Sequence, residues 1–381
     1  MKRKADRFPL LVAVLLFFPV LACGQKEDNA SGGATGGSGS VNGELESTLP
    51  SSSSGIVTIS ERWLSAWDTT ANLDSPAVWV GEGEVWVVTT AKGTHDLWVH
   101  DASTGALLRR VGKPGSGPGE FNYPNGIAIV GDLLLVVERD NHRVQALALP
   151  GFEPLGDFGA DVLERPYGIA VSETPDALSV YVTDDYGNDI DLPDGVAPTG
   201  DFTRRVKQFR VSLAPEGVEA ELVRTFGEAE GPGAILVAES IQVDEEQSLL
   251  LIADEFNLEL EAYSLDGSYL GRTVGSDLYD HGDPEGIMLY RCGSSGYWIL
   301  TDQGFARTVF HVLDRVTMEH LGSFSGEVTA NTDGIWLTQA SVPGLGQGAL
   351  FALHDDGGLA AFAWDDIGQA LGLQTGCSPS L

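Results

Sequence analysis

Acidic residues beside short apolar segments are the residues of this chain best suited to chemistry. One pair, Asp283 and Glu285, flanks a single proline where the apolar segment 287–289 begins. This arrangement is unusual for a simple turn, where an Asp ordinarily caps its own backbone. Carboxylates can hold calcium, which prefers oxygen ligands and tolerates irregular coordination. Such a site requires a fold that gathers several carboxylates at one point.

An internal repeat predicts such a fold. Six segments open with a turn residue and continue as a short apolar strand, and they recur roughly every 50 residues with one longer interval. They are 76–80, 124–129, 166–171, 239–243, 284–289 and 332–337. Each is followed by a second β-rich run, at 85–92, 133–139, 180–185, 249–255, 297–303 and 349–355. Third strands follow in several units, at 97–100, 144–147 and 308–311.

Short alternating strands at this spacing, with Gly, Pro and Asp at the turns, are typical of four-stranded propeller blades. The sequence therefore predicts an all-β fold, a six-bladed β-propeller over residues 56–373, and no helix of any length. An acidic insertion, 184–204, accounts for the long interval and is interpreted as a loop. Two stacked β-domains are the alternative, but they do not explain why the same opening recurs six times.

Propeller geometry would bring distant acids together. The first strand of each blade lies nearest the axis and the second runs antiparallel to it, so first-strand starts and second-strand ends share one channel mouth. First-strand starts carry Asp74, Glu239, Asp283, Glu285 and Asp333. Second-strand ends carry Lys92, Arg139, Asp140, Asp184, Asp185, Asp254, Glu255, Asp302, Gln303, Asp355 and Asp356. So many acids would repel one another unless they face solvent, cap turns or share divalent cations.

The N-terminus has the features of an export signal. A basic start precedes an apolar run, 8–22, that is too short to span a bilayer. The run ends Val-Leu-Ala-Cys-Gly, which resembles the lipobox of bacterial lipoproteins, in which Cys23 would carry the lipid. We therefore expect a lipoprotein signal peptide at 1–22 and a flexible Gly/Ser-rich tether at 23–55. The protein would then be exported and anchored to a bacterial membrane, on its periplasmic or cell-surface side; an ordinary signal peptide is the alternative.

Two further cysteines and the net charge limit the remaining possibilities. If Cys23 carries lipid, Cys292 and Cys377 either form a disulfide that ties the C-terminal tail, 374–381, to the body, or remain two buried free thiols. The formal net charge of -33 argues against nucleic acid and anionic lipid headgroups as partners. We expect membrane contact only through the anchor, and a monomer.

Four segments resemble the C-terminal half of the β-propeller phytases. They are Asp-Pro-Glu-Gly-Ile-Met-Leu-Tyr at 283–290, Gly-Tyr-Trp-Ile-Leu-Thr-Asp-Gln-Gly at 296–304, Thr-Asp-Gly-Ile at 332–335 and Ala-Trp-Asp-Asp-Ile at 363–367. Upstream, Asp-Ser-Pro-Ala-Val-Trp at 74–79 and Val-Arg-Thr-Phe at 223–226 are also similar. Phytases of this family are calcium-dependent six-bladed enzymes that remove phosphate from inositol phosphates. The resemblance implies the same activity here, on inositol phosphates or similar small phosphate esters.

The resemblance also implies site residues. Carried over by position, it implies Ca²⁺ ligands at Glu239, Glu255, Asp283, Glu285, Gln303 and Asp333. Tyr167 matches a site tyrosine, and Lys92 and Arg139 match cationic phosphate binders. The implied catalytic set is Glu239, Asp283, Glu285, Lys92, Arg139 and Tyr167, with calcium activating a water that attacks phosphorus directly.

Two positions depart from the family pattern. Ser75 stands where the family has a second aspartate, and Asp185 lies where the family carries a phosphate-binding lysine. Both changes would weaken a calcium and phosphate site. Arg204, Arg205 or Lys207, beyond the insertion, could compensate for the lost lysine.

The middle of the chain resembles a different group, the NHL repeats. Two segments resemble the sequence motif of that repeat: Gly-Ser-Gly-Pro-Gly-Glu-Phe-Asn-Tyr-Pro at 115–124 and Glu-Arg-Asp-Asn-His-Arg-Val at 138–144. NHL propellers are commonly scaffolds without chemistry, so a non-catalytic propeller that binds a protein or glycan at the cell surface is the main alternative. A calcium-dependent lactonase is a third hypothesis, although no set of Asn ligands stands at the blade openings.

Overall fold

The computed structural model describes residues 55–186 and 196–378. The predicted signal peptide, Cys23 and all of the predicted tether except Gly55 lie outside these residues, as does part of the acidic insertion. Within the two described ranges, no helix combines the length and apolar character needed to cross a membrane.

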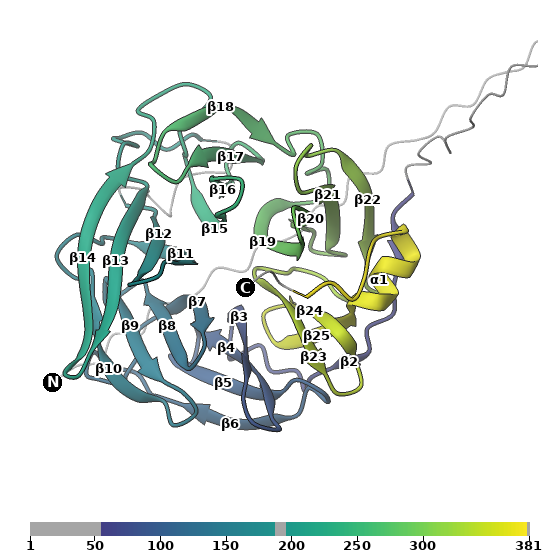
Figure 1. Ribbon diagram of the computed structural model, residues 1–381, viewed down its shortest axis with the longest axis horizontal. Helices are drawn as coiled ribbons and strands as arrows, with labels where there is room; N and C mark the ends of the chain where they lie inside the picture. The colour runs from purple at the N-terminus through teal and green to yellow at the C-terminus, as the bar shows by residue number, and fades with distance from the viewer. Residues whose placement is uncertain (1–54, 187–195, 379–381) are drawn as a thin grey trace, which may run out of the picture. The chain divides into compact units, whose positions relative to one another are not determined.

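Six sheets stand around a common axis as the blades of a β-propeller, which confirms the predicted fold (Figure 1). Blade 1 contains β3 (Leu73–Val80), β4 (Val85–Ala91), β5 (Asp96–Asp101) and β6 (Leu107–Val111). Blade 2 contains β7 (Pro124–Val130), β8 (Leu133–Glu138), β9 (Arg143–Ala148) and β10 (Glu153–Phe158). Blade 3 contains β11 (Pro166–Glu173), β12 (Leu178–Asp184), β13 (Val206–Ala214) and β14 (Gly217–Phe226).

The remaining blades include strands from both ends of the chain. Blade 4 contains β15 (Ala238–Asp244), β16 (Leu249–Asp254), β17 (Glu259–Ser264) and β18 (Tyr269–Val274). Blade 5 contains β19 (Asp283–Cys292), β20 (Ser295–Gln303), β21 (Val309–Asp314) and β22 (His320–Ser325), with β1 (Val57–Thr58) added at its edge. Blade 6 contains β23 (Ile335–Val342), β24 (Gly346–His354) and β25 (Gly358–Ala363), and β2 (Trp63–Leu64) supplies its outermost strand. N-terminal residues thus complete the last two blades and close the ring.

The strand registers confirm that first-strand starts meet second-strand ends. Ala238 of β15 pairs with Asp254 of β16, and Asp283 of β19 pairs with Gln303 of β20. The six first strands lie innermost around the axis (Figure 1). Acids separated by more than 200 residues, such as Asp74 and Asp333, are therefore brought to the same channel mouth.

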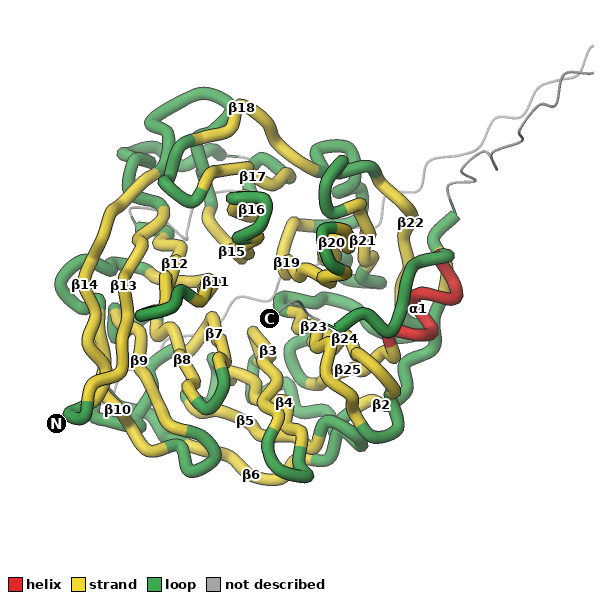
Figure 2. The backbone as a smooth tube through the Cα atoms, in the orientation of Figure 1, coloured by secondary structure: helices red, strands yellow, loops and turns green. Residues whose placement is uncertain are grey.

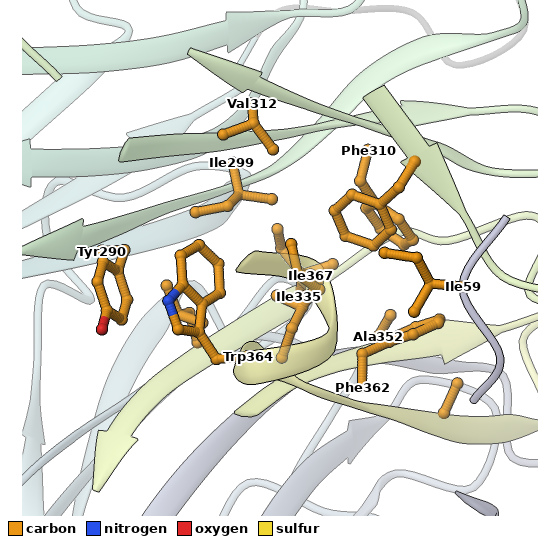
Figure 3. Packing of buried hydrophobic residues seen from close by; sticks show 14 residues of the cluster. Ile59, Tyr290, Ile299, Phe310, Val312, Ile335, Ala352, Phe362, Trp364 and Ile367 are labelled. Carbon is orange, nitrogen blue, oxygen red and sulfur yellow. The ribbon is translucent and has the colours of Figure 1, made fainter. Parts of the chain in front are cut away.

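The chain folds this way because the faces between blades are apolar. One of the clusters between blades joins Ile299 and Phe310 of blade 5 with Ile335 and Phe362 of blade 6 (Figure 3). Burying such side chains stabilises the ring by roughly 25 cal/mol for each Å² of apolar surface removed from water.

A short helix, α1 (Trp364–Leu371), is a departure from the prediction of an entirely helix-free chain (Figure 2). Its buried face carries Trp364 and Ile367, and the Trp364 ring stacks on Tyr290 with 4.2 Å between ring centroids. Asp365 and Asp366 lie in the first turn, where acids interact favourably with the helix dipole. Eight residues are too short a segment for their periodicity to have distinguished a helix from a strand.

The C-terminal tail is joined to the propeller by a disulfide between Cys292 and Cys377. Cys292 ends β19, so the bridge lies at the channel end opposite to Asp283. Gln339 of blade 6 also donates a hydrogen bond to the Cys377 carbonyl oxygen, at 2.9 Å. Of the two alternatives for these cysteines, the structure has the bridged form.

Candidate functional site

The innermost strands of blades 1 to 5 each carry a β-bulge at the same position. In each strand the regular pairing is interrupted for two residues, for example between Pro166 and Ile169 in β11. The first bulge residues are Asp74, Asn125, Tyr167, Glu239 and Glu285, and Asp333 precedes β23 in the sixth blade. A bulge re-aims the side chain that it carries. We call these six residues the axial ring.

Small residues follow the ring positions because neighbouring blades approach closely there. A Cβ atom on Gly126 would lie 2.4 Å from the carbonyl oxygen of Tyr167, and one on Gly168 would lie 2.6 Å from that of Glu239. Both distances are far below van der Waals contact, so only glycine fits without moving the next blade's ring residue.

Lys92 is a buried cation that contacts two members of the axial ring. Its Nζ lies 2.7 Å from Oδ1 of Asp74 and 3.1 Å from Oδ2 of Asp333, so it joins blades 1 and 6. The Tyr167 hydroxyl donates to Oδ1 of Asp74 at 3.1 Å, and Gln303 Nε2 donates to Asp333. Lys92 was predicted to bind phosphate; here its charge is already shared between two carboxylates.

Ser75 is one of the departures from the phytase pattern, and its side chain contacts Asp74. Its hydroxyl donates to Oδ2 of Asp74 at 2.8 Å. A second carboxylate is missing, but Ser75 orients the one that remains.

The ring carries more negative charge than its one lysine can balance. Burial, followed by the charges of Glu255, Asp185 and Asp74, raises the pKa of Glu239 well above its ordinary value. Burial and the neighbouring carboxylates, Glu239 first, likewise raise the pKa of Glu285. For Asp333, burial outweighs the opposing effect of Lys92 and raises the pKa to about 7. The ring would therefore gain from any cation that enters it.

Two more predicted ligands lie beside the ring. A hydrogen bond joins the Glu255 and Glu239 carboxyl groups. Burial, then the charge of Asp283, raises the pKa of Glu255, and burial also raises the pKa of Asp283. The six residues predicted as calcium ligands thus all belong to this one mouth.

A hard cation such as calcium fits this donor set. The donors are carboxylate and amide oxygens, and Oε2 of Glu239 is buried without a hydrogen-bond partner. In the described part of the chain, no three His, Cys, Asp or Glu side chains are already arranged as a metal site. Lys92, between two of the carboxylates, occupies part of the space that a cation would share.

Several acids predicted to face the channel mouth instead hold the loops between blades. Asp184 accepts backbone N–H groups of Glu164 at 2.9 Å and Arg165 at 2.7 Å. Asp254 and Asp302 are equally buried and accept backbone N–H groups of the loop before their own blade's first strand. Their backbone positions were predicted correctly, but their side chains turn into the loops and stabilise the fold.

The second departure from the phytase pattern, acid in place of lysine, is offset locally. Buried Arg205 contacts Asp185 at 3.1 Å, and buried Lys207 contacts Asp184 at 2.6 Å. These two cations therefore neutralise the acids beside them. Arg204, half-exposed and stacked on the Tyr186 ring, is the member of the three that reaches solvent.

Arginines line the blade 2 and blade 3 side of the mouth. The Arg139 guanidinium lies over the Tyr123 ring, 3.5 Å from its centroid, and pairs with Asp140 at 2.8 Å. Arg165, which the sequence analysis did not select, immediately precedes β11 and lies 4.0 Å from Asp185. The remaining predicted mouth acids, Asp355 and Asp356, follow β24 on the opposite side of the ring.

A cavity of about 790 Å³ follows the axis behind the ring. The small residues that follow the ring positions line one part of it, and Ile129, Ile169 and Leu337 line the apolar wall. The charged ring therefore stands at one end of a channel with a partly apolar wall, and charged residues such as Glu173 and Arg291 line it at the opposite strand ends.

Asn125 is the ring member that the sequence analysis missed. It stands in Pro124-Asn-Gly-Ile, which shares its Pro, Gly and Ile with Pro166-Tyr-Gly-Ile and Pro284-Glu-Gly-Ile. Aligning the six openings, rather than searching for acids, could have identified it.

Comparison with known protein families identifies one repeat. The NHL repeat family matches residues 121–147, which cover β7, β8 and most of β9 in blade 2. No curated protein sequence matches the chain.

Solved structures with a similar fold include three propeller-containing proteins. A nidogen/laminin complex has a TM-score of 0.43 and 15% identity, covering 69% of this chain and 83% of that chain. BBS1N in complex with ARL6DN has a TM-score of 0.46 and 13% identity, covering 80% and 97%. A luciferin-regenerating enzyme has a TM-score of 0.49 and 10% identity, covering 81% and 94%. At these identities the similarity concerns the fold alone.

Proposed function

We propose that the axial ring binds calcium and that the protein is a phytase-like phosphomonoesterase, acting on inositol phosphates or similar phosphate esters. The observation that carries the proposal is the cluster of buried carboxylates around Lys92, with raised pKa values at Glu239, Glu285 and Asp333. Carboxylates left in this state favour a bound cation, and a cation there would attract a phosphate group to the mouth.

Each residue has a defined part in this proposal. The ligands would be Glu239, Glu255, Asp283, Glu285, Gln303 and Asp333. Calcium bound to them would neutralise charge on the phosphate ester and lower the pKa of a bound water. Lys92 stays protonated, because Asp74 and Asp333 outweigh the effect of burial and raise its pKa, and it holds both carboxylates in place.

In this proposal two residues would contact the phosphate ester itself. Burial, then Asp74, raises the pKa of Tyr167, so its hydroxyl keeps its proton. That proton is donated to Asp74 at 3.1 Å, and the hydroxyl would have to turn from Asp74 to donate to a phosphate oxygen. Arg139 presents a guanidinium at the mouth, held by Tyr123, and guanidinium groups match phosphate geometry.

Phosphate release tests the proposal directly. The purified chain is incubated with myo-inositol hexakisphosphate in calcium and in chelator, and inorganic phosphate is measured. We expect release in calcium only, and a loss of at least about a hundredfold in Glu285→Gln, since a ligand is removed. Asp355→Asn, which alters an exposed acid on the blade 6 side of the same mouth, is the matched control and should keep its activity. Equal release with and without calcium, or none in either, would refute the proposed activity.

A non-catalytic propeller that binds a protein or glycan is the second candidate, favoured by the NHL match at residues 121–147. It predicts calcium binding without hydrolysis, or neither. The phosphate assay distinguishes the two candidates, because only the first predicts release of inorganic phosphate.

The proposed site of action is outside the cytoplasm, with the chain anchored through a lipid on Cys23. The Cys292–Cys377 disulfide supports this, because disulfides persist in oxidising compartments. Cys23→Ala removes the lipid attachment, so in cell fractionation the variant should be found in the soluble fraction and not in the membrane fraction. Retention of the variant in the membrane fraction would argue against this anchor.

A further inference from the structure

Asn125 holds the same bulge position in blade 2 that Asp74 holds in blade 1 and Tyr167 holds in blade 3. Its side chain therefore belongs to the axial ring. The Tyr167 hydroxyl reaches Asp74 at 3.1 Å, across the blade between them, and Asn125 is fully buried.

The Asn125 amide is unsatisfied. Neither Nδ2 nor Oδ1 has a hydrogen-bond partner, although both are buried. The backbone does not depend on this side chain, since the Asn125 carbonyl oxygen already accepts from the Thr90 hydroxyl at 2.6 Å. A buried amide with no partner destabilises a fold, so its presence in the ring calls for a ligand.

We propose that Oδ1 of Asn125 is a ligand of the cation held in the axial ring, its one neutral amide ligand from an innermost bulge. This rests on the proposed calcium site and adds a residue to it. Amide carbonyl oxygens are ordinary calcium ligands. A neutral ligand also suits a ring whose carboxylates already repel one another, because it coordinates without adding negative charge.

Calcium affinity and apo stability distinguish a ligand from a merely structural residue. Calcium titration of the full chain should show about tenfold or greater weakening in Asn125→Leu. Without calcium, the same variant should melt no lower than the wild type, because leucine replaces an unsatisfied amide of similar size. Asn125→Asp, which keeps the oxygen, should keep calcium binding.

Two further variants keep the test decisive. Gln208→Leu removes another buried amide, in β13 and outside the ring, whose Oε1 also has no partner, and it should leave the calcium affinity unchanged. Asn125→Ala serves if the leucine does not fold, as judged by circular dichroism, and should lose affinity equally. Wild-type affinity in the folded leucine or alanine variant would overturn the role of Asn125 alone. Absence of calcium binding in the wild type would overturn the calcium site together with it.

Discussion

Glu261 makes the stability of this propeller depend on pH in a way that one substitution can remove. It lies in β17 of blade 4, fully buried, and neither carboxyl oxygen has a hydrogen-bond partner. Burial, then the charges of Glu259 and Asp254, raises its pKa from 4.5 to about 9. The carboxyl is therefore protonated in the folded protein at neutral pH.

Other blades avoid this conflict. Where blade 4 places Glu261 near Asp254, blade 2 places Gln145, whose Nε2 donates to Glu138 at 3.0 Å, and blade 3 places Lys207 2.6 Å from Asp184. Among these three blades, only blade 4 has an acid of its third strand, Glu261, near the acid that ends its second strand, Asp254.

The magnitude follows from proton linkage. A carboxyl whose pKa is raised on folding costs nothing below its unfolded pKa of 4.5, and stability falls as pH rises from there to about 9. At pH 7, about 2.5 pH units above the unfolded pKa, the loss is at most about 3.5 kcal/mol, since each tenfold preference for the protonated form is worth about 1.4 kcal/mol. The figure is an upper limit because small movements would rehydrate the carboxylate.

Glu261→Gln copies the protonated carboxyl and should remove this loss. We expect the variant to match the wild type near pH 4.5 and to exceed it increasingly towards pH 9. Urea unfolding in chelator, monitored by tryptophan fluorescence at each pH in this range, measures the free energy of unfolding of the wild type and the variant. Glu219→Gln, which alters an exposed glutamate of β14 in blade 3, is the control and should retain the pH dependence. Parallel curves for the wild type and Glu261→Gln would refute the reasoning.

Two further predictions concern the site and the tail. Lys92→Met leaves Asp74 and Asp333 buried without their cation, so the free energy of unfolding in chelator should fall by about 3–5 kcal/mol. Calcium should restore part of this loss. If urea unfolding shows no such fall, the lysine is dispensable for stability. Cys377→Ser opens a disulfide that spans 85 residues, which should lower the free energy of unfolding by about 4 kcal/mol, and a melting temperature equal to that of the oxidised wild type would contradict this.

Much of the site could be placed from the sequence because blade geometry follows from periodicity. Recurring openings predicted which residues start first strands and end second strands, so the backbone positions of Asp74, Glu239, Asp283, Glu285 and Asp333 at one mouth were predicted correctly. The roles assigned to them, and the lipid on Cys23, stay predictions.

Side-chain direction is what the sequence left open. Asp184, Asp254 and Asp302 occupy the predicted mouth positions, yet they turn into the loops, because unpaired backbone N–H groups there need acceptors. Asn125 and Asp74, by contrast, are aimed at the axis by bulges. Lys92 stands between two acids of different blades, one of them 241 residues away along the chain. Local pattern fixes which strand a residue belongs to; its contacts across the ring depend on which blades close beside one another, and only the folded molecule determines that.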